Sequence, residues 1–220
     1  MWVKICATTN LEDALLAVEA GADAVGFVFA ASKRQVTAEQ VAAITAHLPA
    51  GVSKVGVFTA TDAAEILAQA GMAGLDVVQL HSVFNAGLIE AVAGAGLRAL
   101  QVIDVPAEAG ADEIRASLVE ALQHPQVYAV LLDASHGGHS GGTGKTFDWE
   151  RMAGAVREAE SATGGRVVIA GGLRPENVGL AIVRFEPWGV DVASGVEAVP
   201  GKKDPSRVKA FISAARGVVP

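Results

Sequence analysis

The chain has 220 residues, 51% of them hydrophobic and 5% aromatic, so it can form one large domain or two small ones around an aliphatic core. Its formal net charge of −7 argues against a nucleic-acid or anionic-membrane partner, because both favour a basic surface. A lone cysteine rules out an internal disulfide, and no stretch reads as a signal peptide or approaches the roughly 20 apolar residues of a membrane helix. We therefore expect a soluble, cytoplasmic protein.

Short apolar runs alternate with amphipathic segments along the chain, which is the pattern of strands followed by helices. We expect strands over residues 3–7, 24–29, 54–58, 76–81, 98–103, 128–132, 166–170 and 190–193. Helices are expected over about residues 11–20, 37–48, 62–71, 85–95, 111–122, 177–185 and 206–215, and a further helix begins at Asp148. Thr37 and Gln40 have the spacing of a capping box.

The regular strand–helix alternation predicts an α/β fold with parallel strands joined by right-handed crossovers. An open doubly wound sheet usually has fewer strands and a GxGxxG turn after the first one, whereas this first turn reads CATTN. Eight short units without linkers favour a (β/α)8 TIM barrel that forms a single domain over residues 1–220. In such a barrel the active site lies at the C-terminal ends of the strands.

The stretch from Tyr128 to Trp149 contains the clearest candidate for a reacting group. Asp133 stands where the sixth strand is expected to end, and a loop rich in glycine follows it. A carboxyl group at that place can act as an acid or base in a pocket, or it can simply cap a turn.

Strand alternation indicates which other polar side chains face the barrel interior, since residues two apart share a face. The interior-facing polar residues expected near the strand ends are Lys4, Cys6, Gln79, His81, Gln101, Asp133 and Asp191. Buried polar groups are costly unless paired. So many of them at one level predict a polar site at one mouth, and a closed internal hydrogen-bond network is the alternative.

Glycines in two late loops suggest an anion site. Gly171 and Gly172 follow the seventh strand, and Ser194 and Gly195 follow the eighth. Backbone N–H groups at such positions can approach a phosphate closely, and these two loops hold phosphate in many barrels. Residues 195–198 could add the short helical turn that often accompanies such a site. We therefore expect a phosphorylated ligand.

Several stretches at the strand ends have the form of a known family. They are VKICATTNLEDA, DAVGFVF with SKR, VQLH, LLDA with GGTGKTFDW, AGGLRPENV and VDVASGVEAVPGKKD. In this order, and across nearly the whole chain, they resemble the phosphoribosylanthranilate isomerases. The resemblance implies an Amadori rearrangement of N-(5-phosphoribosyl)anthranilate to 1-(2-carboxyphenylamino)-1-deoxyribulose 5-phosphate in tryptophan biosynthesis, with no cofactor and no metal.

The resemblance also implies roles for individual residues. Cys6 matches the general base and Asp133 the general acid, while Arg34 matches the arginine that holds the anthranilate carboxylate. His81 and Asp191 match pocket-lining positions. The phosphate loops contain Gly171, Gly172, Ser194 and Gly195.

These residue types suit the chemistry. A carboxylic acid can protonate the furanose oxygen as the ring opens, and a thiolate can then remove the proton from C2. A free cysteine has a pKa of about 8.5, so Cys6 needs help to ionise near neutral pH. Lys4, on the same strand face, is our hypothesis for that help.

Four positions depart from the family pattern: Ala7 and Ser82 replace glycines, Gln35 replaces an aromatic residue, and Gln101 replaces an inward lysine. None is the proposed acid, base or carboxylate clamp, so we expect them to affect efficiency rather than identity.

Other interpretations remain open at this stage. A lyase resembling indole-glycerol-phosphate synthase would need a catalytic lysine at a strand end, and a barrel that only binds a phosphorylated ligand would need no acid or base. His136 and His139 could bind a metal but are expected to be polar loop residues. Lys202 and Lys203 are expected to form a solvated turn. Either a monomer or a homodimer fits the sequence.

Overall fold

The structure, a computed structural model, describes residues 1–136, 139–140 and 148–218, without the side chains of residues 135, 136, 139 and 140. Parallel strands close into a barrel in the order β5-β4-β3-β2-β1-β9-β8-β6, and β5 pairs with β6 to complete it. They are β1 (Trp2–Ile5), β2 (Ala24–Val28), β3 (Ser53–Phe58), β4 (Val77–Leu80), β5 (Arg98–Pro106), β6 (Val127–His136), β8 (Val167–Ile169) and β9 (Gly189–Val192). The predicted barrel is confirmed.

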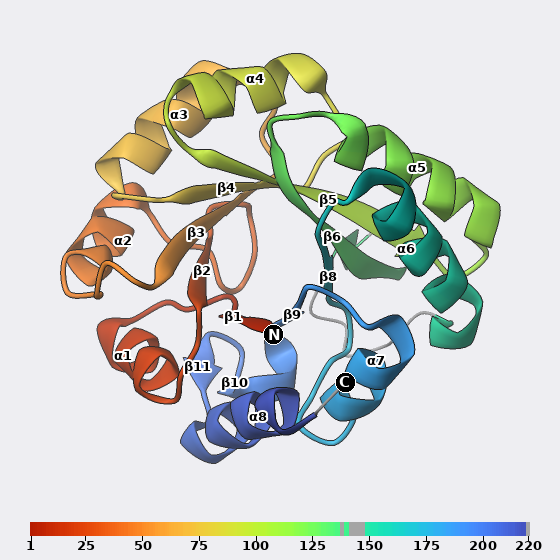
Figure 1. The fold of residues 1–220 in the computed structure, drawn as a ribbon. Helices are drawn as coiled ribbons and strands as arrows, with labels where there is room; N and C mark the ends of the chain where they lie inside the picture. Colours follow the sequence, from red (N-terminus) through yellow and green to blue (C-terminus); the bar gives the residue numbers. More distant parts are fainter. Residues whose placement is uncertain (137–138, 141–147, 219–220) are drawn as a thin grey trace.

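Helices surround the barrel as an outer ring (Figure 1). They are α1 (Leu11–Glu19), α2 (Ala38–Thr45), α3 (Ala63–Met72), α4 (Ala86–Gly94), α5 (Ala111–Gln123), α6 (Trp149–Thr163), α7 (Val178–Phe185) and α8 (Pro205–Gly217). Side-chain oxygens cap several of their first turns, among them Asn10, Asp62 and Asp148. The capping box of Thr37 and Gln40 is present.

In the described part of the chain, four short elements add to the eight strands and eight helices. A short strand, β7 (His139–Ser140), pairs antiparallel with β6. After β9 come the 3-10 turn η1 (Ser194–Val196) and an antiparallel hairpin made of β10 (Glu197–Val199) and β11 (Lys202–Lys203). The turn η1 lies close to the expected extra turn at residues 195–198.

Two separate apolar clusters show which way the strands face. One fills the barrel and contains Val55, Val77, Leu100, Leu131 and Val168, and the other packs the strands against the helices. Aliphatic side chains therefore fill the barrel interior toward the N-terminal ends of the strands, and the polar side chains lie at the C-terminal ends.

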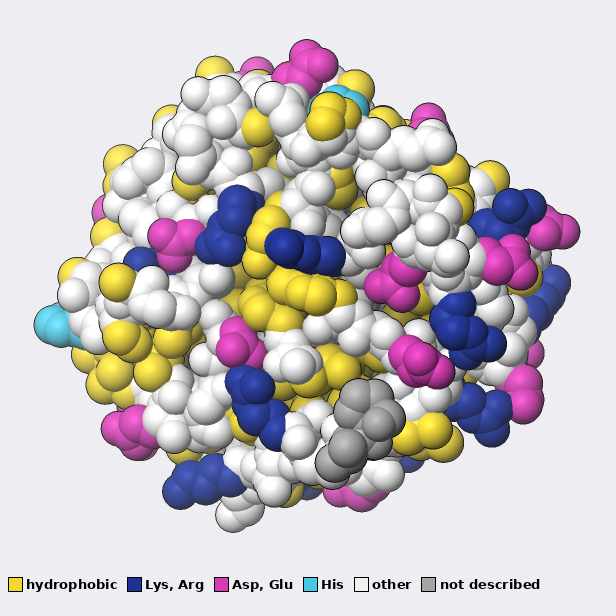
Figure 2. All heavy atoms as spheres, viewed as in Figure 1, with side chains coloured by type: hydrophobic (Ala, Val, Ile, Leu, Met, Phe, Trp, Pro, Cys, Tyr) yellow, Lys and Arg dark blue, Asp and Glu magenta, His cyan; other side chains and the backbone are white. Residues whose placement is uncertain are grey.

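The opposite, N-terminal end is closed by aromatic rings. Trp2 stacks on Trp188 with ring centroids 5.0 Å apart, and Tyr128 meets Trp188 edge-on. Arg98 and Arg166 lie over these rings. The view in Figure 2, which has the chain's N-terminus at its centre, shows hydrophobic side chains beside Lys and Arg groups.

The fifth strand corrects one expectation. Gln101 does not face the interior: it pairs with Leu80 in the β4–β5 register, and both belong to the face that packs on the helices. Its amide nitrogen donates to the carbonyl of Ser82 at 2.8 Å. Gln101 is consequently absent from the polar mouth.

The sixth strand is also longer than predicted. Pairing with β5 continues past Asp133 to Ser135, so Asp133 lies within β6 rather than at its end. It still faces inward, two residues beyond the interior residue Leu131. Among the described helices, none is long and apolar enough to cross a membrane.

Candidate active site

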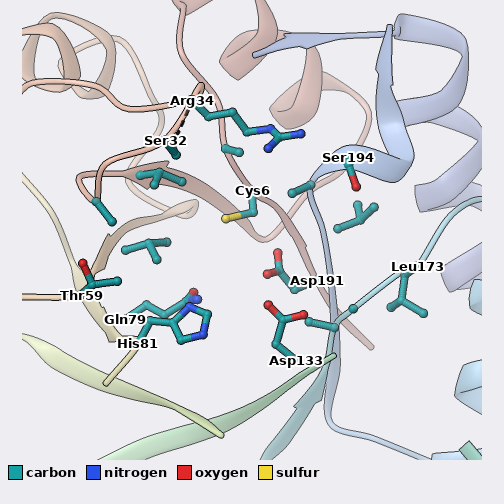
Figure 3. A pocket seen from close by; sticks show the side chains of 18 of the residues that line it. Cys6, Ser32, Arg34, Thr59, Gln79, His81, Asp133, Leu173, Asp191 and Ser194 are labelled. Carbon is teal, nitrogen blue, oxygen red and sulfur yellow. Dashed lines mark hydrogen bonds between the residues drawn. The ribbon is translucent and has the colours of Figure 1, made fainter. Parts of the chain in front are cut away.

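A cavity of about 260 Å³ opens at the C-terminal ends of the strands. Its lining includes every predicted site residue but one: Cys6, Arg34, His81, Asp133, Gly171, Gly172, Asp191 and Ser194. Figure 3 shows Cys6, Asp133 and Asp191 around its centre, with His81 and Gln79 opposite. The fold thus brings together residues that are far apart in the sequence.

The side of the cavity formed by β1 and β9 carries Cys6 and Asp191, and Lys4 is buried behind it. The Lys4 ammonium is fully buried and donates a hydrogen bond to Asp191 Oδ2 at 2.9 Å. Gly26 on β2 makes room for this arrangement, because a Cβ there would lie 2.8 Å from Cys6 Sγ and 2.9 Å from Lys4 Cε. A buried ion pair therefore sits directly beneath the thiol.

Burial raises the pKa of the Cys6 thiol, and the charge of Lys4 opposes that rise. Asp191 adds to the rise, and Lys203 opposes it. The direction of the Lys4 effect agrees with our hypothesis, but burial outweighs it, so Cys6 is a neutral thiol near pH 7. For Lys4 itself, burial works to lower the pKa, whereas Asp191 and Cys6 raise it overall.

The opposite side of the cavity carries Asp133 on β6. The pKa of its carboxyl is raised to about 6, chiefly by burial; the charge of His81 opposes the rise, and those of Asp191 and Asp104 add to it. A hydrogen bond of 2.9 Å joins His81 Nε2 to Asp104 Oδ1 and holds the imidazole at the cavity wall. A carboxyl with this pKa can act as a proton donor near neutral pH.

Glycines allow close packing in the loops that follow β8 and β9, next to Asp133. Gly171 has a φ of +81°, and a Cβ there would collide with the Ala134 backbone and lie 3.0 Å from Asp133 Oδ1. Gly195 is the one predicted residue that does not line the cavity. A Cβ on it would collide with the Leu173 carbonyl, so its role is to let the two loops touch.

Arg34 reaches the cavity from the loop after β2. Its Nε and Nη2 donate to the two carboxylate oxygens of Glu197 at 2.8 and 2.7 Å. This hydrogen bonding to Glu197 raises the pKa of the guanidinium, against the effect of burial. A fork held in this way keeps a fixed orientation at the cavity edge.

Gln79 belongs to the site although it was not among the predicted ligand-binding residues. It lines the cavity, and its Oε1, like Asp191 Oδ1, is buried without a hydrogen-bond partner within the described residues. The signal was present in the sequence, since Gln79 shares a strand face with His81. Buried acceptors of this kind suit the hydroxyl groups of a ligand.

Lys203 contradicts its prediction as part of a solvated turn. Its side chain is fully buried, and its ammonium donates to the carbonyl oxygen of Cys6. The prediction for Lys202 holds better, because that side chain is 45% exposed. The glycine-rich loop over residues 137–138 and 141–147, and the side chains of His136 and His139, lie outside the described part of the chain.

Comparisons with known proteins converge on one family. Residues 3–214 match the family model of N-(5'phosphoribosyl)anthranilate (PRA) isomerase. The chain is 45% identical over 215 residues to an N-(5'-phosphoribosyl)anthranilate isomerase of Pelobacter propionicus, covering 97% of this chain and 95% of the relative.

Solved structures give the same result. A phosphoribosyl anthranilate isomerase in complex with reduced 1-(o-carboxyphenylamino)-1-deoxyribulose 5-phosphate superposes with a TM-score of 0.82 at 37% identity, over 99% of this chain and all of the other. Monomers generated from the dimeric phosphoribosylanthranilate isomerase of Thermotoga maritima give a TM-score of 0.81 at 38% identity, with the same coverage.

Proposed function

The chain belongs to the N-(5'-phosphoribosyl)anthranilate isomerase family, and we propose that Asp133 and Cys6 carry out the acid–base chemistry of this tryptophan-pathway enzyme. The reaction is the Amadori rearrangement of N-(5'-phosphoribosyl)anthranilate to 1-(2-carboxyphenylamino)-1-deoxyribulose 5-phosphate. The observation that carries the assignment is an inward-facing carboxyl with a pKa raised to about 6, which shares one cavity with a buried thiol.

In the first step Asp133 gives its proton to the furanose oxygen as the bond from C1 to that oxygen breaks. The electron pair on the anthranilate nitrogen forms the C1–N double bond, so the product is a protonated Schiff base. A pKa of about 6 leaves a useful fraction of Asp133 protonated near neutral pH.

In the second step Cys6, as a thiolate, removes the proton from C2. The electron pair of the C2–H bond neutralises the Schiff base and gives an enolamine, which tautomerises to the ketone. Because burial raises the pKa of the thiol, the thiolate is a minor species before the substrate binds. The positive charge of the Schiff base, next to that of Lys4, favours the thiolate when it is needed.

The remaining site residues bind the substrate in this proposal. Arg34 holds the anthranilate carboxylate, and the loops with Gly171, Gly172, Ser194 and Gly195 surround the phosphate. His81, Asp191 and Gln79 face the hydroxyl groups of the ribose. Each step uses only groups of the chain and of the substrate. We further propose that the chain works in the cytoplasm as a single barrel domain, as a monomer or a homodimer.

The test follows the loss of phosphoribosylanthranilate fluorescence on addition of the protein. We expect turnover by the wild type, and a kcat lower by about 10²–10⁴-fold for Cys6→Ser and for Asp133→Asn. Both variants should still bind the reduced product analogue, because they remove chemistry and not the phosphate or carboxylate contacts. Binding without turnover by the wild type would instead support a non-catalytic barrel, and turnover of the phosphoribulose product would support a lyase.

A further inference from the structure

The hairpin after β9 carries a buried cation that the acid–base mechanism does not use. Lys203 on β11 faces Glu197 on β10 in the hairpin register, and the side chains are 0% and 4% exposed. The ammonium and the carboxylate oxygen are 3.5 Å apart. Neither residue lines the cavity. A buried lysine is rare unless its donors are bound and its charge is needed.

The donors of Lys203 bind the ends of two barrel strands. Its Nζ donates to the carbonyl oxygen of Cys6, which follows β1, and to that of Ala193 at 3.3 Å, which follows β9. Cys6 carries the proposed base, and Ala193 precedes the phosphate loop. One ammonium therefore joins these two parts of the site, next to the backbone hydrogen bond from the Cys6 N–H to the Val192 carbonyl at 2.8 Å.

Glu197 extends the network to the carboxylate clamp. Besides its ion pair with Lys203, it accepts three hydrogen bonds from Arg34, and its Oε1 accepts one from the Gly201 N–H at 3.2 Å. One carboxylate thus lies between an ammonium and a guanidinium, and the trio has a net charge of +1 when both are protonated. Burial lowers the pKa of Lys203, and the charge of Glu197 opposes that fall. The net positive charge lies behind a pocket proposed to hold a phosphate, a carboxylate and a thiolate.

We propose that Lys203 is a positioning residue of the isomerase: with Glu197 it fixes Cys6, the phosphate loop and Arg34 relative to one another. The inference rests on the proposed roles of Cys6 and Arg34. Lys203 touches no reacting atom and acts through the backbone of Cys6. A small displacement of the base is enough to slow proton transfer by about 10²-fold.

The first experiment is Lys203→Met, which keeps the length of the side chain and removes its charge. We expect kcat to fall about 10–100-fold with a smaller change in KM. Alkylation of Cys6, the single cysteine of the chain, should require a higher pH than in the wild type, because the Lys203 charge opposes the rise of the thiol pKa. The matched control is Lys202→Met, the exposed neighbour on the same strand, for which kcat and the alkylation profile should stay unchanged.

The second variant, Glu197→Gln, separates the two ends of the network. It releases Arg34 while Lys203 keeps its carbonyl acceptors, so KM should rise more than kcat falls. If the network were merely structural, both variants would have a lower melting temperature. Their kcat per folded molecule and the pH profile of Cys6 alkylation would match the wild type, and that result would overturn the proposal. If the wild type failed to turn over the substrate, the proposed function would fail, and the alkylation profiles of Lys203→Met and Lys202→Met would still test the positioning.

Discussion

The two sides of the cavity solve the problem of a buried charge in opposite ways. On the base side, which carries the proposed base Cys6, Lys4 and Asp191 form an ion pair at 2.9 Å beneath the thiol. On the acid side, which carries the proposed acid Asp133, this carboxyl forms no ion pair with any described residue, and burial is the main cause of its raised pKa. The base side contains two ionised groups, Lys4 and Asp191, that attract each other. On the acid side, burial favours the neutral form of Asp133.

The charges on the base side should stabilise the folded state, whereas ionisation of Asp133 should destabilise it. Breaking a buried ion pair leaves an uncompensated charge and destabilises the fold. Neutralising an unpaired buried carboxyl removes a desolvation penalty. Substitutions of similar size on the two sides should therefore change stability in opposite directions.

The largest effect is expected for Lys4→Met, which leaves the Asp191 carboxylate unpaired. The folded-state pKa of Lys4 is raised, so its stabilising contribution is complete below about pH 10 and is lost only as the pH rises through that raised value. At pH 7 the free energy of unfolding should fall by about 3 kcal/mol in urea titrations. The same variant should require a higher pH for alkylation of Cys6, because a charge that opposes the rise of its pKa is gone.

The control for this prediction is Lys54→Met, which removes the more exposed pair of Lys54 with Asp76 at 3.4 Å. Its loss should stay below about 1 kcal/mol. If both variants lost the same free energy of unfolding, the buried Lys4–Asp191 pair would contribute no more to stability than the more exposed Lys54–Asp76 pair.

The acid side should respond in the other direction. The folded-state pKa of Asp133 is about 6, above the unfolded value of about 3.9, so the folded state is progressively penalised as the pH rises from 4 to 6. Asp133→Asn should remove that penalty and stabilise the protein by about 2 kcal/mol at pH 8, with no gain at pH 4. Urea titrations at both pH values measure this, and a loss of stability at pH 8 would contradict it.

How far the sequence predicts these two sides depends on strand alternation. Cys6 and Asp133 face one cavity as expected, because a period of two places alternate residues on the same face of a strand. Gln101 was misplaced because its strand is apolar on both faces, so no alternation marks the inward side. Only the pairing of Gln101 with Leu80 reveals that it packs toward the helices.

Lys203 shows a second limit. Two adjacent lysines after a glycine are typical of an exposed turn, and nothing local separates the buried one from its neighbour. Its acceptors are the carbonyl of Cys6, almost two hundred residues earlier, and that of Ala193. Interactions over such separations exist only once the barrel has closed.

The protonation state of Asp133 should also control how activity depends on pH. The proposed mechanism requires Asp133 protonated and Cys6 ionised, so kcat/KM should rise with pH up to about 6 and then level off, because further loss of the protonated carboxyl cancels the gain in thiolate. His81 lowers the pKa of Asp133 and Asp104 raises it. The bend should therefore move to higher pH in His81→Gln and to lower pH in Asp104→Asn.

The substrate phosphate also titrates near pH 6, so the displacement between variants is the informative quantity rather than the position of the bend. The phosphate is common to all three proteins and cannot move the bend in opposite directions. If the pH profiles of kcat/KM of the three proteins coincided, the bend would belong to the substrate phosphate, and Asp133 would not be the group that titrates.

The smallest effect is expected at Ala7, which stands next to Cys6 where the family pattern has glycine. Ala7 follows Cys6 with a φ of +60° and is buried, a conformation that costs a non-glycine residue about 1 kcal/mol. Ala7→Gly relieves that cost. It also increases the conformational entropy of the unfolded chain, which destabilises the folded state by roughly 0.4–1 kcal/mol and so offsets the gain. The free energy of unfolding should thus change by less than about 0.5 kcal/mol. Glu186→Gly, at the other described non-glycine position with a positive φ, is the matched comparison. A clear loss confined to Ala7→Gly would mean that the methyl group itself packs against the base side and helps to hold Cys6 in place.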